Sequence, residues 1–194
     1  MADVDPRRGP GGSKQYDDRD RYQVIPDRHF GWRMARGGWE LPRKAEENYT
    51  VMRRVSWGSY TNARFQYTIR YPRDLLIPQV ESDNGDGERF LGRDGATLVV
   101  WGGYNTLGQT LARIETDTVG RLAGNSGTVT YRRLQPAWFV FSGVTDDKIF
   151  NAKTHLVGDM QKSFEFTYPR ENADVYRAVT ARIVTSFRSL GSGR

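Results

Sequence analysis

Apolar and aromatic residues recur along residues 64–142 in short runs that turn dipeptides separate. In FQYTIRYP the residues at 65, 67, 69 and 71 are all apolar or aromatic, and this period of two predicts a β-strand with one buried face. Similar runs follow turn signals such as SDNGDG and Asp94-Gly95; they are ERFLGR, ATLVVWGG, TVTYRRL and AWFVFSG. We therefore expect residues 64–142 to supply the central strands of one antiparallel sheet.

The period changes to three and four residues in two segments, which predicts two amphipathic helices. The first covers residues 105–123, and its apolar stripe consists of Leu107, Leu111, Ile114, Thr118 and Leu122. The second follows the alternating runs KIFNAKTHLVG and QKSFEFTYP, and its stripe consists of Val175, Val179, Ile183 and Phe187. We expect Asn172 to be the N-cap of this last helix, with Asp174 in the first turn, where a negative charge suits the helix dipole.

The predicted order β–β–β–α–β–β–β–β–α indicates an α+β domain over residues 57–194. An antiparallel sheet of six to seven strands has to cover at least one face. Two flanking helices can cover it, either as an α/β/α sandwich or as a two-layer arrangement.

Residues 1–56 have a different composition, with few aliphatic residues, both signs of charge, and half of the eight prolines within the first 50 positions. Such a segment cannot bury enough apolar surface to offset the entropy of ordering it. We expect an extended tail that is disordered when it is alone.

The tail nevertheless contains Trp, Tyr and Arg, the residue types most frequent at interface hot spots. Within HFGWRMARGGWELP we interpret five residues as anchors that dock on a partner: Phe30, Trp32, Arg33, Arg36 and Trp39. The alternative is that these side chains pack on the protein's own domain.

The chain has a net charge of +6 and carries 24 arginines against five lysines. An arginine-rich surface favours an anionic partner, although a genome biased toward arginine codons gives the same composition. Nucleic-acid binding is therefore the alternative function, with Arg53-Arg54 and Arg132-Arg133 as the best basic positions. The first 50 residues hold ten basic and nine acidic residues, and this balance disfavours a phosphate-binding tail.

Reactive groups are few. The absence of cysteine excludes disulfides and thiolate nucleophiles. His29 lies in the tail, and a lone strand histidine such as His155 is more often packed than a metal ligand. Ser142 lacks the GxSxG context of a nucleophile elbow, and no phosphate-binding glycine motif is present. SDNGDGE favours a hairpin turn over a calcium loop, because Gly85 and Gly87 stand where oxygen ligands are needed.

The order of strands and the spacing of apolar residues in residues 59–190 resemble the Mog1/PsbP-like superfamily, and in particular small bacterial domains of that fold. The resemblance rests on FQYTIRYP, NGDGERFLGRDGATLVVWG, VTYRRLQPAWFVFSG and the closing FEFTYPRENADVYRAVTARIVTSFRSL. It implies an α/β/α sandwich and an accessory role, since the best-known members are a Ran-binding nuclear-transport factor and a lumenal extrinsic subunit of photosystem II. No site motif matches theirs, so no functional residue carries over, and the tail lies outside the family pattern.

These observations predict a non-catalytic accessory subunit, without metal or cofactor, that docks on a larger protein assembly through its tail. No signal peptide or membrane-spanning run is visible. We therefore expect a cytoplasmic protein, and the sequence leaves open a peripheral position on a membrane complex.

Overall fold

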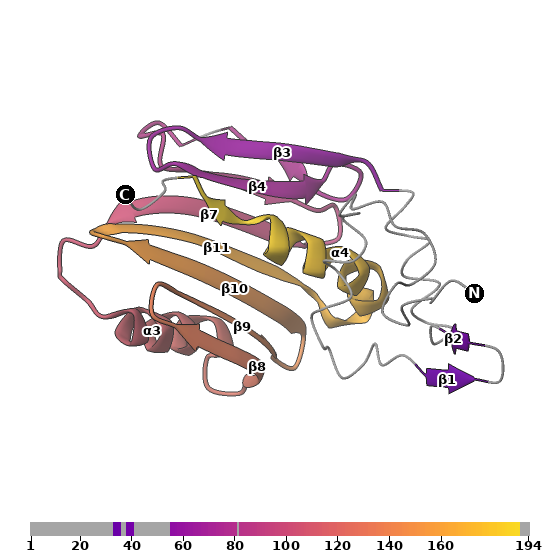
Figure 1. Ribbon diagram of the computed structural model, residues 1–194. Helices are drawn as coiled ribbons and strands as arrows, with labels where there is room; N and C mark the ends of the chain where they lie inside the picture. Colours follow the sequence, from indigo (N-terminus) through magenta and orange to yellow (C-terminus); the bar gives the residue numbers. More distant parts are fainter. Residues whose placement is uncertain (1–32, 36–37, 41–54, 81, 191–194) are drawn as a thin grey trace, which may run out of the picture. The chain divides into compact units, whose positions relative to one another are not determined.

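The computed structural model describes residues 33–35, 38–40, 55–80 and 82–190 of the chain (Figure 1). Contacts divide the chain into two units, Met1–Arg43 and Lys44–Arg194. In the first unit, β1 (Arg33–Ala35) and β2 (Gly38–Glu40) pair as an antiparallel hairpin. The other described elements belong to the second unit, and the division at residues 56 and 57 stays a prediction.

A seven-stranded antiparallel sheet forms the centre of the second unit, as predicted (Figure 1). Its spatial order is β5 (Ile77–Pro78), β6 (Gly87–Leu91), β7 (Thr97–Tyr104), β11 (Met160–Pro169), β10 (Lys148–Val157), β9 (Trp138–Val144) and β8 (Thr128–Gln135). Tight turns connect most neighbours. Gly95 and Gly158 adopt φ values of 88° and 61° in two of these turns, which is why glycine follows or precedes aspartate there. The α+β class is confirmed.

The alternating run at residues 65–71 lies outside this sheet, so the prediction of one sheet for residues 64–142 is wrong. Its strand, β4 (Tyr67–Pro72), pairs with β3 (Trp57–Asn62) and β12 (Arg188–Ser189) in a three-stranded antiparallel sheet. The alternation itself is confirmed, because Tyr67 and Ile69 are fully buried. A period of two reports one buried face and does not report which sheet the strand joins.

The small sheet and α4 (Ala173–Ser186) pack on one face of the large sheet. A 3₁₀ turn, η1 (Arg170–Asn172), leads from β11 into α4. The strand β11 contributes Phe164, Phe166 and Tyr168 to this core, the inward face that the alternation predicts. Aromatic rings dominate the packing here, and Phe164 meets Phe187 edge to face at 5.2 Å between ring centroids.

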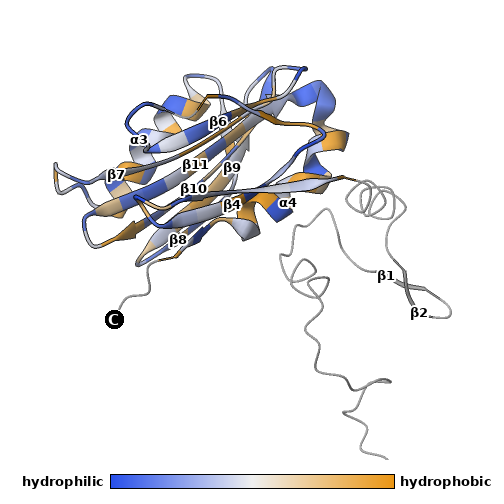
Figure 2. Ribbon diagram, turned by 90° about the horizontal axis from the view of Figure 1, so that it is seen from above, coloured by the Kyte–Doolittle hydropathy of each residue, from blue (hydrophilic) through white to orange (hydrophobic). Residues whose placement is uncertain are grey.

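The helix α3 (Leu111–Ala123) packs on the opposite face, against β8, β9 and β10. Hydrophobic and hydrophilic residues alternate along the strands and helices of this unit (Figure 2). The apolar side of α3 packs with Phe139, Phe141 and Phe150 in a second, smaller cluster. Alternation along β10 separates the two clusters, because Phe150 and Ala152 face α3 whereas Ile149 faces α4.

The helix α3 begins six residues later than the predicted start at residue 105. Asn105 accepts a hydrogen bond from the Gln109 backbone N–H at 2.9 Å and donates to the Gln109 carbonyl at 2.8 Å, which closes a loop instead of a helical turn. Thr110 is the N-cap and accepts from the Arg113 N–H. Leu107 is therefore 82% exposed, although the pattern places it in the buried stripe.

The helix α4 also differs from prediction at its first turn. Val175 is 41% exposed, and Tyr176 is buried in its place. Asn172 holds the N-cap position and Asp174 lies in the first turn, as predicted, but the Asn172 side chain makes no capping hydrogen bond. It donates to Asp94 at 2.8 Å, and the Tyr176 hydroxyl donates to the same carboxylate at 2.9 Å. The β6–β7 turn thus anchors the start of α4, and burial together with this bond raises the pKa of Tyr176.

Candidate functional site: a cationic and aromatic face beside edge strand β8

The predicted tail anchors fall only partly on described residues. Arg33 lies in β1 and Trp39 in β2, where they belong to adjacent backbone pairs of the hairpin: Arg33 is opposite Glu40, and Trp39 is opposite Met34. Phe30, Trp32 and Arg36 lie outside the described residues. Their role as a docking site stays a prediction.

Within the second unit, one face of β8, β9 and β10 gathers cationic and aromatic side chains. We call it the β8 face and define it by Tyr131, Arg133, Trp138, Lys153 and His155. The sheet register places His155 opposite Trp138, and Lys153 and Arg133 opposite Val140. Opposed residues of an antiparallel pair project to the same side of the sheet, so the five side chains share one surface.

Trp138 is the centre of the β8 face. The Arg133 guanidinium carbon lies 5.5 Å from its ring centroid, and the Lys153 ammonium nitrogen lies 5.7 Å from it. Contacts of this length allow cation–π attraction on the order of 0.5–1 kcal/mol at a half-exposed site. The His155 ring follows, with its centroid 6.5 Å from Trp138 and 5.5 Å from Phe187.

Lys153 joins the β8 face to the end of α4. Its ammonium group donates to the carbonyls of Val184 and Phe187, at 3.3 and 3.2 Å. The carbonyls at a helix C-terminus lack partners within the helix and carry partial negative charge, so a cation there is favourable. Burial, and secondarily the charge of Arg188, lower the pKa of Lys153 to about 8.

A second lysine is buried beside the β8 face, on the next strand and on the same side of the sheet. Lys162 stands opposite His155 in the β10–β11 register and is fully buried. It donates to the Ser189 hydroxyl at 2.6 Å and to the Gln66 carbonyl at 3.2 Å. Gln66 adopts φ 51°, a left-handed conformation that is unusual for a residue other than glycine. Burial lowers the pKa of Lys162, and its bonds hold β12 and the β3–β4 turn in place.

His155 is neutral at physiological pH. Burial first, then the charge of Lys153, lower its pKa to about 4, against a hydrogen bond with the Phe187 backbone that raises it. Its Nε2 atom is buried without a hydrogen-bond partner, and so is the Nδ2 atom of Asn151, four residues earlier on the same side of β10. Among the described residues, no carboxylate forms an ion pair with Lys153 or Lys162.

The two neighbouring arginines of β8 have different surroundings. Arg132 faces α3 and forms two bonds to Glu115, Nε–Oε1 at 2.7 Å and Nη2–Oε2 at 2.6 Å. Glu115 is fully buried on the inner side of α3. It directly follows Ile114 and comes three residues before the stripe position Thr118, and this place beside the apolar stripe is the signal that could have found it. Of the predicted basic pair, Arg133 alone remains without a carboxylate.

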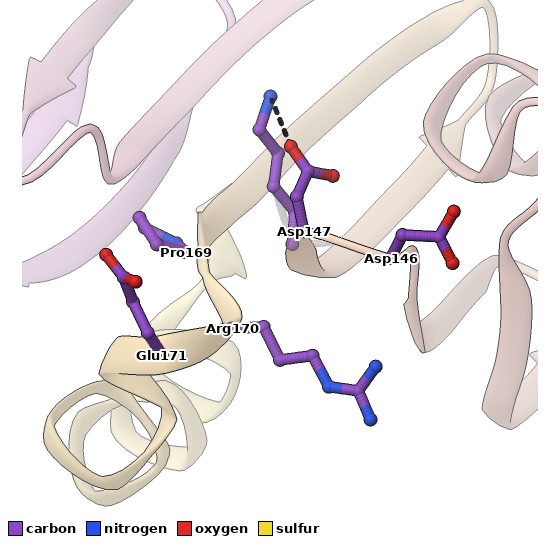
Figure 3. Close-up of a pocket in the computed structure, with 6 residues that line it drawn as sticks. Asp146, Asp147, Pro169, Arg170 and Glu171 are labelled. Atoms are coloured by element: carbon purple, nitrogen blue, oxygen red, sulfur yellow. Dashed lines mark ion pairs between the residues drawn. The ribbon is translucent and has the colours of Figure 1, made fainter.

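A hollow lies at the other end of β10, between the β9–β10 turn and η1 (Figure 3). It is lined by Asp146, Asp147, Lys148, Pro169, Arg170 and Glu171. Asp147 and Lys148 pair at 3.8 Å, whereas the labelled side chains otherwise point in different directions. In the part of the chain that the structure describes, no three His, Asp or Glu side chains converge on a metal position.

The turn at residues 82–87 uses its polar side chains internally. Asp86 accepts hydrogen bonds from the Ser82 hydroxyl and the Asn84 amide, both at 2.7 Å. Gly85 supplies a left-handed backbone with φ 63°. The hairpin interpretation of this segment is confirmed for the described positions, because β5 and β6 on either side of the turn pair antiparallel.

Comparison with known proteins shows a likeness of fold. No family model matches the chain, and no curated protein matches it. A solved structure does: the solution structure of cyanobacterial PsbP (CyanoP) from Synechocystis sp. PCC 6803, with a TM-score of 0.51 and 15% identity. The match covers 70% of this chain and 93% of that chain. The fold is Mog1/PsbP-like. At this identity the likeness shows the Mog1/PsbP-like fold alone, so the β8 face rests on its own geometry. Among the described residues, no helix has the length and apolarity to cross a membrane.

Proposed function

We propose that this protein is a non-catalytic accessory subunit of a larger protein assembly. The observation that carries the proposal is the PsbP-like fold of the second unit. The resemblance to the Mog1/PsbP-like superfamily implies a domain that serves as a partner on a larger machine and does not turn over a substrate.

The use of the buried charges supports this proposal. Lys153 holds the C-terminus of α4, Lys162 holds β12 and the β3–β4 turn, and Arg132 neutralises Glu115. Each of these groups is engaged in positioning an element. A rigid domain of this kind suits a platform, whereas catalysis needs titratable groups directed at a reacting atom.

Docking through the tail is the finer part of the proposal. Phe30, Trp32, Arg33, Arg36 and Trp39 are its anchors, because aromatic residues and arginine supply large contact area and planar hydrogen bonding at interfaces. The assembly is either soluble or peripheral to a membrane, and separation of the native complex into soluble and membrane fractions distinguishes the two.

The test is co-purification of the assembly with full-length variants from native cells. Replacement of Phe30, Trp32 and Trp39 by alanine is expected to release the partner subunits. The matched control replaces Tyr16 and Tyr22, two tail aromatic residues outside the anchor segment, and is expected to retain them. Deletion of residues 1–50 is expected to have the same effect as the triple variant. If the triple variant retains every subunit in unchanged yield, docking through the tail is wrong.

Nucleic-acid binding remains the alternative, with less support from the geometry. Arg132 is committed to Glu115, so one member of the Arg132-Arg133 pair is not available to a phosphate. Arg53-Arg54 lies outside the described residues. Binding through phosphates requires affinity that falls steeply with salt, and a salt-independent filter-binding titration removes this alternative.

A further inference from the structure

The strand β8 is the long free edge of the large sheet. It pairs with β9 on one side, and no strand among the described residues pairs with its other side. The opposite edge of the sheet is β5, which has only two residues, against eight in β8. Six of the eight residues of β8 are exposed. An edge of this length presents a row of backbone N–H and C=O groups that can pair with another extended chain.

The features of β8 select which chain can pair with it. A register irregularity lies between Val129 and Tyr131, and two adjacent arginines follow. Bulges and charged side chains on an edge are common defences against edge-to-edge aggregation. Two copies of β8 bring Arg132 and Arg133 close to their own counterparts, and like charges placed opposite one another are destabilising. The edge therefore disfavours a second copy of this chain.

The positive charge of the adjoining β8 face indicates the charge of the segment that can bind there. Arg133 and Lys153 lie on either side of Trp138, and Arg188 is close enough to lower the pKa of Lys153. Lys162 lies next to His155 on the same side of the sheet and contributes to the lowered pKa of His155. The basic groups thus act on one another, and none of the ion pairs of the described residues places a carboxylate among them. A negatively charged ligand along this face relieves that repulsion.

We propose that β8 and the β8 face bind an extended acidic segment of a partner protein, which adds a strand to the large sheet. The bound segment is extended because only a strand can pair with successive backbone groups of an edge. It is acidic because its side chains on the α4 side lie over Arg133 and Trp138. It is a polypeptide because the edge offers alternating N–H and C=O groups, which a peptide backbone matches. This surface lies on the second unit and does not depend on docking through the tail.

The experiment measures binding of a fluorescein-labelled ten-residue peptide of alternating threonine and glutamate to the full chain by fluorescence anisotropy. Binding that weakens as salt rises is expected. Arg133→Glu is expected to lower the affinity about tenfold, because it reverses the charge that the peptide contacts. The matched control is Arg89→Glu, the same change at an exposed position of β6. This position lies five strands away across the sheet, about 24 Å at the usual strand spacing, and the expected change is less than twofold.

A second peptide, with proline at two central positions, separates strand pairing from simple charge attraction. Proline lacks the N–H that an edge needs, so its binding is expected to fall at least tenfold. Equal binding of the two peptides, or equal losses in Arg133→Glu and Arg89→Glu, overturns the proposal. A single-stranded oligonucleotide that binds through Arg133 while the peptide does not also overturns it, and so does concentration-dependent dimerisation through β8 without peptide binding.

Discussion

The two faces of the β8–β10 end of the sheet handle charge in opposite ways. On the α3 face, Arg132 meets the buried Glu115 in a two-bond ion pair over an apolar cluster. On the α4 face, Lys153 and Lys162 are held by carbonyl and hydroxyl oxygens, and Arg133 contacts the ring of Trp138. On the α3 face, the charges of Arg132 and Glu115 neutralise one another within the domain. The α4 face carries positive charge that the described residues do not neutralise, which is the property expected of a surface that meets a partner.

The largest expected effect on stability comes from breaking the ion pair of the α3 face. Arg132→Ala leaves Glu115 buried without its partner, and we expect the free energy of unfolding to fall by about 3 kcal/mol, toward the low end for a broken buried pair because Arg132 itself is half exposed. Urea denaturation at pH 7 measures the change. The double variant Arg132→Leu with Glu115→Leu, which removes both charges, is expected to recover most of the loss. A loss below about 1 kcal/mol would contradict the idea that Arg132 and Glu115 form a stabilising buried pair, since that is the range of an exposed surface pair.

The next effect is a rise in stability at alkaline pH from Lys153. Its pKa is about 8 in the folded protein and 10.5 in the unfolded chain, so the unfolded chain binds more protons between these values. Stability therefore increases as pH rises, by about 2 kcal/mol between pH 7 and pH 9.5. Lys153→Met is expected to remove this rise in urea denaturation at the two pH values. An equal rise in Lys153→Met shows that another group is responsible.

His155 is expected to act at acidic pH with a smaller effect. Its pKa is about 4 in the folded protein against 6.5 when unfolded, so its contribution is complete above pH 6.5 and is lost as pH falls toward 4. The loss between pH 7 and pH 5 is about 1 kcal/mol after a discount for the exposed part of the ring. In His155→Phe, the thermal unfolding midpoint is expected to depend less on pH over this range. If the variant keeps the slope of the wild type, carboxylates cause it instead.

The smallest effect on stability is expected at Arg133. Its only described contact of note is the cation–π contact with Trp138. Arg133→Ala is therefore expected to change the free energy of unfolding by less than about 1 kcal/mol, in contrast to its neighbour Arg132. Chemical denaturation of the two single variants side by side tests the comparison directly. Similar losses of unfolding free energy in both variants would mean that Arg133, like Arg132, has a stabilising partner within the domain.

The helices show how far pattern analysis reaches. The stripe of the last helix correctly includes Val179 and Ile183, but it assigns Val175 to the core where Tyr176 lies. The reason is the Asp94 carboxylate, which accepts the Tyr176 hydroxyl and makes burial of that ring favourable. Asp94 is 82 residues away along the chain, so no local period reports it.

The candidate site was beyond the sequence for the same reason. KTHLVG indicates a strand with a lone histidine, and Arg132-Arg133 indicates a basic pair. The pattern does not reveal that Glu115 neutralises one of these arginines. Nor does it reveal that Lys153 reaches the carbonyl of Phe187, 34 residues later. Both contacts join elements whose separation is set by the sheet.

The sequence by itself determined the approximate positions of both helices and of most strands in the large sheet, because side-chain period and turn chemistry act over a few neighbouring residues. It also indicated the Mog1/PsbP-like fold from the order of these elements, which the PsbP likeness confirms. The tertiary structure decided that β4 leaves the large sheet, which arginine is paired, and where the buried lysines point. These outcomes depend on contacts between residues far apart in the chain, and the free energy of such contacts exists only once both elements are in place.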